Sequence, residues 1–214
     1  LVVDVNGIRA ILDTGSPMSF GKGPLTILGR PVDFVEAELG VTPEYLSEKV
    51  GRKIDALIGL DVLGRFYFEV DTAAGRCVFS TEASQAGGAR FRLESLMGAP
   101  VLSAVIGGAT VRLIVDTGAH IGYLTDERLA GRRRLGARED FHPLMGEYTT
   151  EAHEVPLSIG ELGMSLVFGT MPPELQLLIA MTETDGVLGT DLFNGRKAWF
   201  ALPDGEMFLS ELAA

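Results

Sequence analysis

Residues 11–20 read ILDTGSPMSF, and residues 113–124 read LIVDTGAHIGYL. Each stretch has apolar residues directly before Asp-Thr-Gly, and the two aspartates, Asp13 and Asp116, are 103 positions apart. One Asp-Thr-Gly would carry little weight, because Asp and Gly are ordinary turn residues. Two copies, each at the end of an apolar run, indicate instead that the chain contains a repeated unit.

The sequence around the two copies is repeated as well. Before each copy, two apolar runs flank a turn signal, Asn-Gly at 6–7 and Gly-Gly at 107–108, which predicts a β-hairpin. After each copy comes a landmark of two apolar residues, Gly, one residue and Asp, at 57–61 and 187–191. A further hairpin is predicted after each landmark. Because these features recur in the same order, we infer an internal duplication.

Most segments are short, rich in Val, Ile, Leu, Phe and Thr, and broken by glycines, which predicts mainly β structure. Short helices are predicted at 42–51 and 124–136, where Thr lies near the start and Gly stands at the end. The three arginines at 132–134 are interpreted as a solvated face of the second helix.

The composition allows a well-packed fold. The 214-residue chain is 46% apolar, enough to bury a sizeable core in one compact domain or in two small lobes. We expect a first lobe at 1–83, a linker at 84–90 in a stretch rich in small and polar residues, and a second lobe at 91–214.

Charge and cysteine content exclude several classes of protein. The formal charge of −11 disfavours binding to nucleic acid, which needs a basic surface. Cys77 is the only cysteine, so an intrachain disulfide and a cysteine-rich zinc site are excluded. No apolar run reaches the roughly 18 residues of a membrane span. The chain begins at Leu1 rather than Met, so an upstream leader or anchor stays open and no compartment is assigned.

Two aspartate loops suit one kind of hydrolysis. Cleaving a peptide bond with water needs a base for the water and an acid for the carbonyl oxygen and the leaving nitrogen. Two neighbouring carboxyl groups meet both needs, because they cannot both ionise easily and therefore share one proton. Glycine after each Thr would let the backbone turn sharply and approach the partner loop.

With these residues the sequence resembles aspartic peptidases of the pepsin and retropepsin clan over nearly its whole length, as two tandem retropepsin-like halves. The resemblance implies an all-β, two-lobed acid-protease fold, with two small β-barrel-like lobes, short helices and an active site at their interface. It implies that Asp13 and Asp116 are catalytic. It also implies supporting roles for other loop residues (Thr14, Gly15, Ser16, Thr117, Gly118 and Ala119) and for the buttress behind each loop (Ile58, Gly59, Leu188 and Gly189).

Three further residues near these elements suggest specific contacts. The Ser16 hydroxyl would either hydrogen-bond Asp13 and favour its ionised form, leaving Asp116 as the proton carrier, or only cap the loop. Asp61 and Asp191 recur after each buttress. They are interpreted as caps of the following helical turn rather than as catalytic groups.

The two halves are unequal between their shared landmarks. Asp13 to Gly59 spans 46 positions, whereas Asp116 to Gly189 spans 73. The family places its substrate-covering flap hairpin in this interval. We therefore predict one flap, at 141–155 in the second lobe, which reverses the arrangement in pepsins. Its tip residues are predicted to bind substrate: Met145, Gly146, Glu147 and Tyr148. Tyr148 would cover the bound peptide or pack on its own lobe.

The predicted function is that of an aspartic endopeptidase that cleaves extended peptides between apolar residues. A peptide-binding or regulatory module that keeps the fold without turnover is the alternative. Two complete loops in one chain predict a monomer with pseudo-twofold symmetry, and a dimer of chains is the other arrangement. His120 would line a substrate pocket or lie on the surface. The histidines share no metal-ligand spacing, so no metal or cofactor is predicted.

Overall fold

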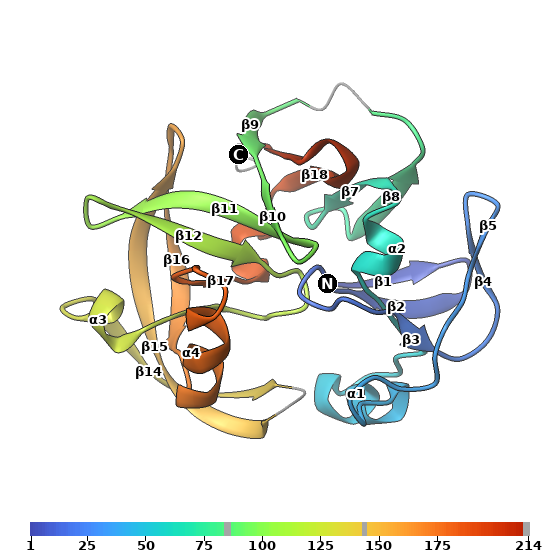
Figure 1. Ribbon diagram of the computed structural model, residues 1–214, viewed down its shortest axis with the longest axis horizontal. Helices are drawn as coiled ribbons and strands as arrows, with labels where there is room; N and C mark the ends of the chain where they lie inside the picture. Colours follow the sequence, from blue (N-terminus) through green and yellow to red (C-terminus); the bar gives the residue numbers. More distant parts are fainter. Residues whose placement is uncertain (84–86, 143–144, 212–214) are drawn as a thin grey trace.

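The computed structural model describes residues 1–83, 87–142 and 145–211. Strands dominate and the helices are short, so the predicted all-β class is confirmed. Figure 1 shows two lobes side by side, one built from the first half of the chain and one from the second, with a further sheet that joins them.

The first lobe is built on a four-stranded sheet in the order β1-β2-β6-β3. Its strands are β1 (Val2–Val5), β2 (Ile8–Leu12), β3 (Phe20–Gly21) and β6 (Ala56–Ile58). The predicted Asn6-Gly7 hairpin joins β1 and β2, and both turn residues have the positive φ values that such tight turns need. β2 then runs parallel to β6, so the end of β2 lies beside the end of β6.

The second lobe repeats this arrangement. Its strands β11 (Ala99–Ile106), β12 (Ala109–Val115), β17 (Gly186–Leu188) and β13 (Gly122–Leu124) correspond to β1, β2, β6 and β3. Leu12 pairs with Ile58 in one lobe, and Val115 pairs with Leu188 at the same place in the other. The duplication seen in the sequence is therefore a duplication of strand topology.

The second-lobe sheet is larger than its counterpart. It has eight strands in the order β10-β11-β12-β17-β13-β16-β15-β14. The additional strands are β10 (Glu94–Leu96), β14 (Arg133–His142), β15 (Gly146–Ile159) and β16 (Leu162–Thr170). The longer interval in the second half thus mainly extends this sheet.

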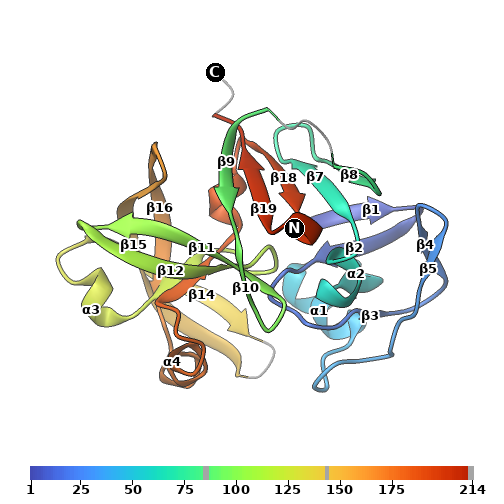
Figure 2. The same cartoon turned by 45° about the horizontal axis from the view of Figure 1, so that its top comes forward.

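A five-stranded sheet joins the two halves in the order β8-β7-β18-β19-β9 (Figure 2). Its strands are β7 (Tyr67–Asp71), β8 (Arg76–Ser80), β9 (Ala89–Arg92), β18 (Lys197–Ala201) and β19 (Glu206–Leu209). The terminal hairpin of each half enters this sheet, and β7 pairs with β18 across the duplication. The last two residues of the expected linker, Ala89 and Arg90, belong to β9. The division into lobes at 83 and 91 stays a prediction.

The remaining elements are short. They are β4 (Leu25–Ile27), β5 (Arg30–Val32), α1 (Pro43–Val50), α2 (Leu60–Leu63), α3 (Asp126–Leu129), α4 (Pro173–Ala180), η1 (Thr190–Phe193) and η2 (Leu202–Asp204). The helix predicted at 42–51 is confirmed as α1. The Thr42 side chain accepts a hydrogen bond from the Tyr45 N–H, and Gly51 ends the helix with a left-handed φ of 71°.

The helix predicted at 124–136 is wrong beyond its first turn. α3 ends at Leu129, and the chain enters β14 at Arg133. Gly136 lies at a β-bulge with φ 98° rather than at a helix end. The arginine run is therefore not a helix face, although Arg133 and Arg134 are exposed. Pairing of β14 with β15 along its length overrides the local helical signal.

One apolar core runs through both lobes and the joining sheet. Its fully buried members come from both halves and include Leu12, Phe68, Leu113, Phe168 and Phe200. Trp199 is buried as well. The two lobes therefore form one packed unit in which the aspartate loops face each other.

Within the described ranges, no helix is both long and apolar enough to cross a membrane.

Candidate active site

The two aspartates follow equivalent strands and are fixed by equivalent contacts. Asp13 comes directly after β2 and Asp116 directly after β12. The Asp13 N–H donates to the Ile58 carbonyl at 3.0 Å, and the Asp116 N–H donates to the Leu188 carbonyl at 2.9 Å. The apolar residues predicted as buttresses therefore hold the start of each loop.

The buttress glycines lie where a side chain would not fit. A Cβ added at Gly59 would lie 2.6 Å from the Met18 carbonyl oxygen, and one at Gly189 would lie 2.4 Å from the Ile121 carbonyl oxygen. Each glycine thus lets the segment after β6 or β17 pass directly against the backbone of the aspartate loop.

The two loops are interlocked through their threonines, which are fully buried. The Thr14 hydroxyl donates to the Val115 carbonyl at 2.6 Å and accepts from the Thr117 N–H at 3.0 Å. The Thr117 hydroxyl donates to the Leu12 carbonyl at 2.8 Å and accepts from the Thr14 N–H at 3.0 Å. Each threonine therefore ties its own loop to the backbone of the other half.

We expect Thr14→Val and Thr117→Val each to lower the free energy of unfolding by about 2–4 kcal/mol, because each removes two hydrogen bonds and leaves buried backbone groups unpaired. Urea unfolding followed by fluorescence measures this loss. Thr110→Val is the matched control, since Thr110 is exposed on β12. A loss at Thr14 no larger than at Thr110 would contradict the interlock.

Both aspartate side chains are held in the same way by their own loops. Asp13 Oδ1 accepts from the N–H groups of Gly15 at 2.8 Å and Ser16 at 3.0 Å. Asp116 Oδ1 accepts from those of Gly118 at 2.7 Å and Ala119 at 3.1 Å. The backbone N–H groups of each loop therefore fix the orientation of its carboxyl group.

Each loop glycine lies against the carboxyl group of the opposite loop. A Cβ added at Gly15 would lie 2.4 Å from Asp116 Oδ2, and one at Gly118 would lie 2.4 Å from Asp13 Oδ2. Only glycine permits this approach, which brings the two aspartates together in one half-buried site.

This environment changes the acidity of the pair. Burial, followed by the charge of Asp116, raises the pKa of Asp13 well above its ordinary value, although the Gly15 N–H acts in the opposite direction. Ionising both carboxyl groups is therefore unfavourable, and the pair retains a proton at pH values where an isolated Asp would have lost it.

The Ser16 hydroxyl makes contacts other than the one considered from the sequence. It donates to the Met18 carbonyl at 2.9 Å or to Glu38 Oε2 at 3.0 Å, while only the Ser16 backbone N–H reaches Asp13. Glu38 precedes a tight turn of the first lobe and gives no sequence signal of its own. The hydroxyl therefore ties the loop to Glu38 rather than favouring the ionised form of Asp13.

The prediction that Asp61 and Asp191 cap helical turns is wrong. Asp61 Oδ1 accepts from the Ser19 hydroxyl, which itself accepts from the Gly59 N–H. Asp191 Oδ2 accepts from the Val167 N–H in β16. Asp61 therefore ties the segment after Gly59 to Ser19, and Asp191 ties the segment after Gly189 to strand β16.

The segment predicted as a flap is the hairpin of β14 and β15. Met145 and Tyr148 pack against the second-lobe cluster of Ile121, Tyr123 and Met171, and the Tyr148 ring lies 6.2 Å from the Tyr123 ring. Gly146 begins β15 with φ 76°. Tyr148 thus packs on its own lobe. Residues 143–144 of the predicted flap lie outside the described residues.

Two contacts of this hairpin had no signal in the sequence. The Tyr123 hydroxyl donates to Asp140 Oδ2, and Glu147 pairs with Lys49 of the first lobe. Both join residues whose spacing in the chain follows no recognisable pattern. His120 is exposed, and its carbonyl accepts from the Thr190 hydroxyl at 3.0 Å.

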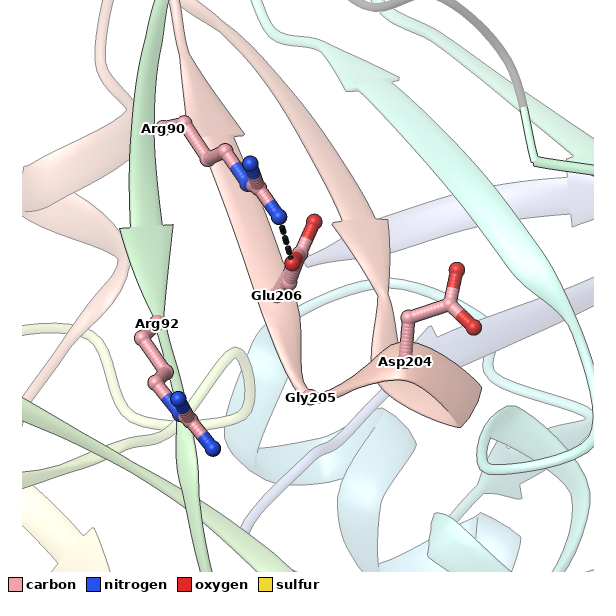
Figure 3. Close-up of a pocket in the computed structure, with 5 residues that line it drawn as sticks. All are labelled: Arg90, Arg92, Asp204, Gly205 and Glu206. Atoms are coloured by element: carbon pink, nitrogen blue, oxygen red, sulfur yellow. Dashed lines mark hydrogen bonds and ion pairs between the residues drawn. The ribbon is translucent and has the colours of Figure 1, made fainter.

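The features outside the aspartate loops are weaker candidates for a binding site. In the part of the chain that the structure describes, no three His, Cys, Asp or Glu side chains come together as metal ligands would. A surface hollow on the joining sheet is lined by Arg90, Arg92, Asp204, Gly205 and Glu206 (Figure 3). Arg90 is already paired with Glu206 there, and neither loop aspartate lines the hollow.

Comparison with known proteins finds only low similarity to solved structures. No protein-family model matches the chain. No curated protein matches it. Among solved structures, the foamy viral protease–reverse transcriptase with an RNA/DNA hybrid is 12% identical over 43% of this chain and 11% of that chain, with a TM-score of 0.35. The simian foamy virus (mac) protease is 16% identical over 43% of this chain and 90% of that chain, with a TM-score of 0.33. Both alignments cover less than half of this chain, so the site is interpreted from its own geometry.

Proposed function

We propose that this protein is an aspartic endopeptidase that uses Asp13 and Asp116 as a shared acid–base pair. The observation that carries the proposal is the mutual approach of the two loops, in which each glycine lies against the other half's carboxyl group. The loops are fixed from behind by the buttress strands and from the side by the threonine interlock. Such fixed carboxyl groups suit acid–base catalysis, because little reorganisation is needed during reaction.

In the proposed reaction, the pair holds one proton and a water molecule lies between the carboxyl groups. The ionised carboxylate removes a proton from the water as its oxygen attacks the carbonyl carbon of the substrate. The protonated carboxyl group donates to the carbonyl oxygen. The tetrahedral intermediate collapses when the carboxyl group that took the water proton passes it to the leaving nitrogen and the ionised partner takes a hydroxyl proton from the intermediate, which yields a carboxylic acid and an amine and restores the shared proton. The raised pKa belongs to the coupled pair, so the shared proton is assigned to the two carboxyl groups together.

We propose extended peptides with apolar residues around the cut as substrates. Met18 is 43% exposed and follows the Asp13 loop. On the other side, the half-buried Ala119 and Met145 both pack against the second-lobe apolar cluster. These side chains offer apolar contacts on both sides of the pair, while an extended backbone would be held by main-chain hydrogen bonds. Because both loops come from one chain, a monomer suffices for the site.

The test is a digest of a peptide library between pH 3 and pH 8, analysed by mass spectrometry. The proposal predicts cuts between apolar residues that a peptide with a hydroxyethylene in place of the scissile amide suppresses. A strict requirement for a charged residue beside the cut would contradict the substrate class. Binding of the hydroxyethylene peptide without any cleavage would favour a peptide-binding module instead.

We expect peptide cleavage to fall as the solution becomes alkaline. The folded-state pKa of Asp13 is raised, so its proton is retained below that pKa and lost as the pH rises through it. Once both carboxyl groups are ionised, no acid is left to protonate the carbonyl oxygen. The measurement is the pH profile of kcat/KM on one peptide. A rate that still rises above about pH 8 would contradict the shared proton.

A further inference from the structure

The end of the β14–β15 hairpin that holds Phe141 and Glu147 lies against helix α1 of the opposite lobe. The ring of Phe141, at the end of β14, meets the Tyr45 ring edge-on, with centroids 5.3 Å apart and planes at 73°. Phe141 and Tyr45 both pack against the same buried first-lobe cluster, which includes Phe20 and Leu46. A second-lobe strand thus contributes a side chain to the apolar packing of the first lobe.

An ion pair fastens the other strand of the hairpin to the same helix. Lys49 Nζ lies 2.7 Å from Glu147 Oε1, and it also lies 5.3 Å from the centroid of the Tyr45 ring. The Lys49 side chain is only 18% exposed, whereas that of Glu147 is 70% exposed. Lys49 is therefore held between an aromatic ring of its own helix and a carboxylate of the opposite lobe.

The same hairpin also reaches the aspartate pair. His142 follows Phe141, and burial lowers its pKa while the charges of Asp116 and Asp140 act in the opposite direction. Met145 packs in the cluster that includes Ala119, next to the Asp116 loop. Figure 1 shows this end of the hairpin beside α1 of the first lobe.

We propose that Tyr45 and Lys49 are positioning residues that clasp the β14–β15 hairpin across the aspartate pair. This interlobe clasp, defined as Tyr45 and Lys49 with Phe141 and Glu147, rests on the proposed function. The hairpin covers substrate from the second lobe, and the clasp secures the end that holds Phe141 and Glu147 to the first lobe. The clasp opens to admit a peptide and closes over it, so that the closed form contributes to peptide binding.

The chemistry of the clasp suits repeated opening better than permanent packing. The ladder of β14 and β15 runs from the pair Arg133–Glu154 to the pair His142–Gly146, so the hairpin does not need α1 in order to fold. The ion pair is largely exposed on the Glu147 side, which makes it weak and sensitive to salt. One aromatic pair and one ion pair hold the hairpin end without making its release slow.

The first experiment measures amide hydrogen exchange at Phe141, His142 and Glu147 in the free protein. We expect Lys49→Met to quicken exchange at these amides about tenfold, because the ion pair and the cation–π contact are both lost. The conservative Lys49→Arg variant should retain slow exchange. Lys22→Met is the matched control, since it breaks another ion pair of α1, with Glu44, away from the hairpin. Equal exchange in the Lys49→Met and Lys22→Met proteins would overturn the proposal.

Swapping the two charges of the ion pair keeps the proposal testable if single variants weaken the helix. Lys49→Glu and Glu147→Lys should each quicken exchange, and the double variant should restore slow exchange. With peptide substrate, the single variants should raise KM several-fold with a smaller change in kcat, and the double variant should lower KM again. Failure of the double variant to restore slow exchange would overturn the clasp. Exchange needs no turnover, so absence of peptide cleavage would refute only the proposed function.

Discussion

Asp13→Asn and Asp116→Asn are each expected to lower kcat/KM for peptide cleavage by about a thousandfold or more. An amide cannot accept the proton of the attacking water, and it cannot share the proton that the pair holds. Because each half supplies one member of the pair, either replacement alone removes both the acid and the base functions. Initial rates on one apolar peptide, measured near the optimum pH, give the effect.

The matched control is Asp33→Asn, since Asp33 is exposed between β5 and α1. Its rate should equal that of the unmodified protein. The Asp13→Asn protein should also stay folded. Above the ordinary carboxyl pKa the unfolded chain releases a proton that the folded pair retains, so the raised folded-state pKa lowers stability there, and Asn removes that cost. The variant should therefore gain stability at pH 7 but not at pH 3. Substantial turnover by either loop variant would refute the shared pair.

Gly118→Ala is expected to lower kcat/KM about a hundredfold and to destabilise the fold by about 1–3 kcal/mol. The added Cβ would lie 2.4 Å from Asp13 Cγ and Oδ2, so the carboxyl group and the loop must move apart. A displacement near 1 Å between reacting groups can cost about a hundredfold in rate. Gly15→Ala should act similarly, because its Cβ would meet Asp116.

Gly163→Ala is the control for this replacement. Gly163 is exposed in β16, and a Cβ added there meets no described atom within 4 Å. Steady-state kinetics and urea unfolding of the two alanine variants separate crowding at the pair from a general effect of replacing glycine. Full activity in the Gly118→Ala protein would show that the loops do not approach as closely as the structure has them.

The sequence predicted the parts of the fold that rest on local and repeated signals. The Asn6-Gly7 turn, the two Asp-Thr-Gly loops and the buttresses after them recur in one order, and the strand topology recurs with them. Helix α1 was predicted because Thr42 and Gly51 mark its ends within a short stretch. These features depend on neighbouring residues, so a single sequence is enough to find them.

Features that depend on distant pairing were not predictable from the chain alone. The residues of β14 carry a local helical signal. Their strand conformation depends on pairing with β15, whose residues come later in the chain. The joining sheet mixes strands from both halves through the pairing of β7 with β18, which no linker signal reveals. The contact of Lys49 with Glu147 spans 98 positions and joins two ordinary surface residues. The Ser16 hydroxyl reaches Glu38, which precedes the turn closed by the Glu38–Val41 bridge and lies 22 positions along the chain, a contact without a local sequence signal.

The most direct test is a crystal structure of the protein with a peptide that carries a hydroxyethylene group in place of the scissile amide. The hydroxyl stands in for one oxygen of the tetrahedral intermediate. We predict that it lies between Asp13 and Asp116, within hydrogen-bond distance of both carboxyl groups, with the peptide passing between them and the β14–β15 hairpin. A peptide bound elsewhere, or a hydroxyl in contact with only one of the two aspartates, would contradict the account.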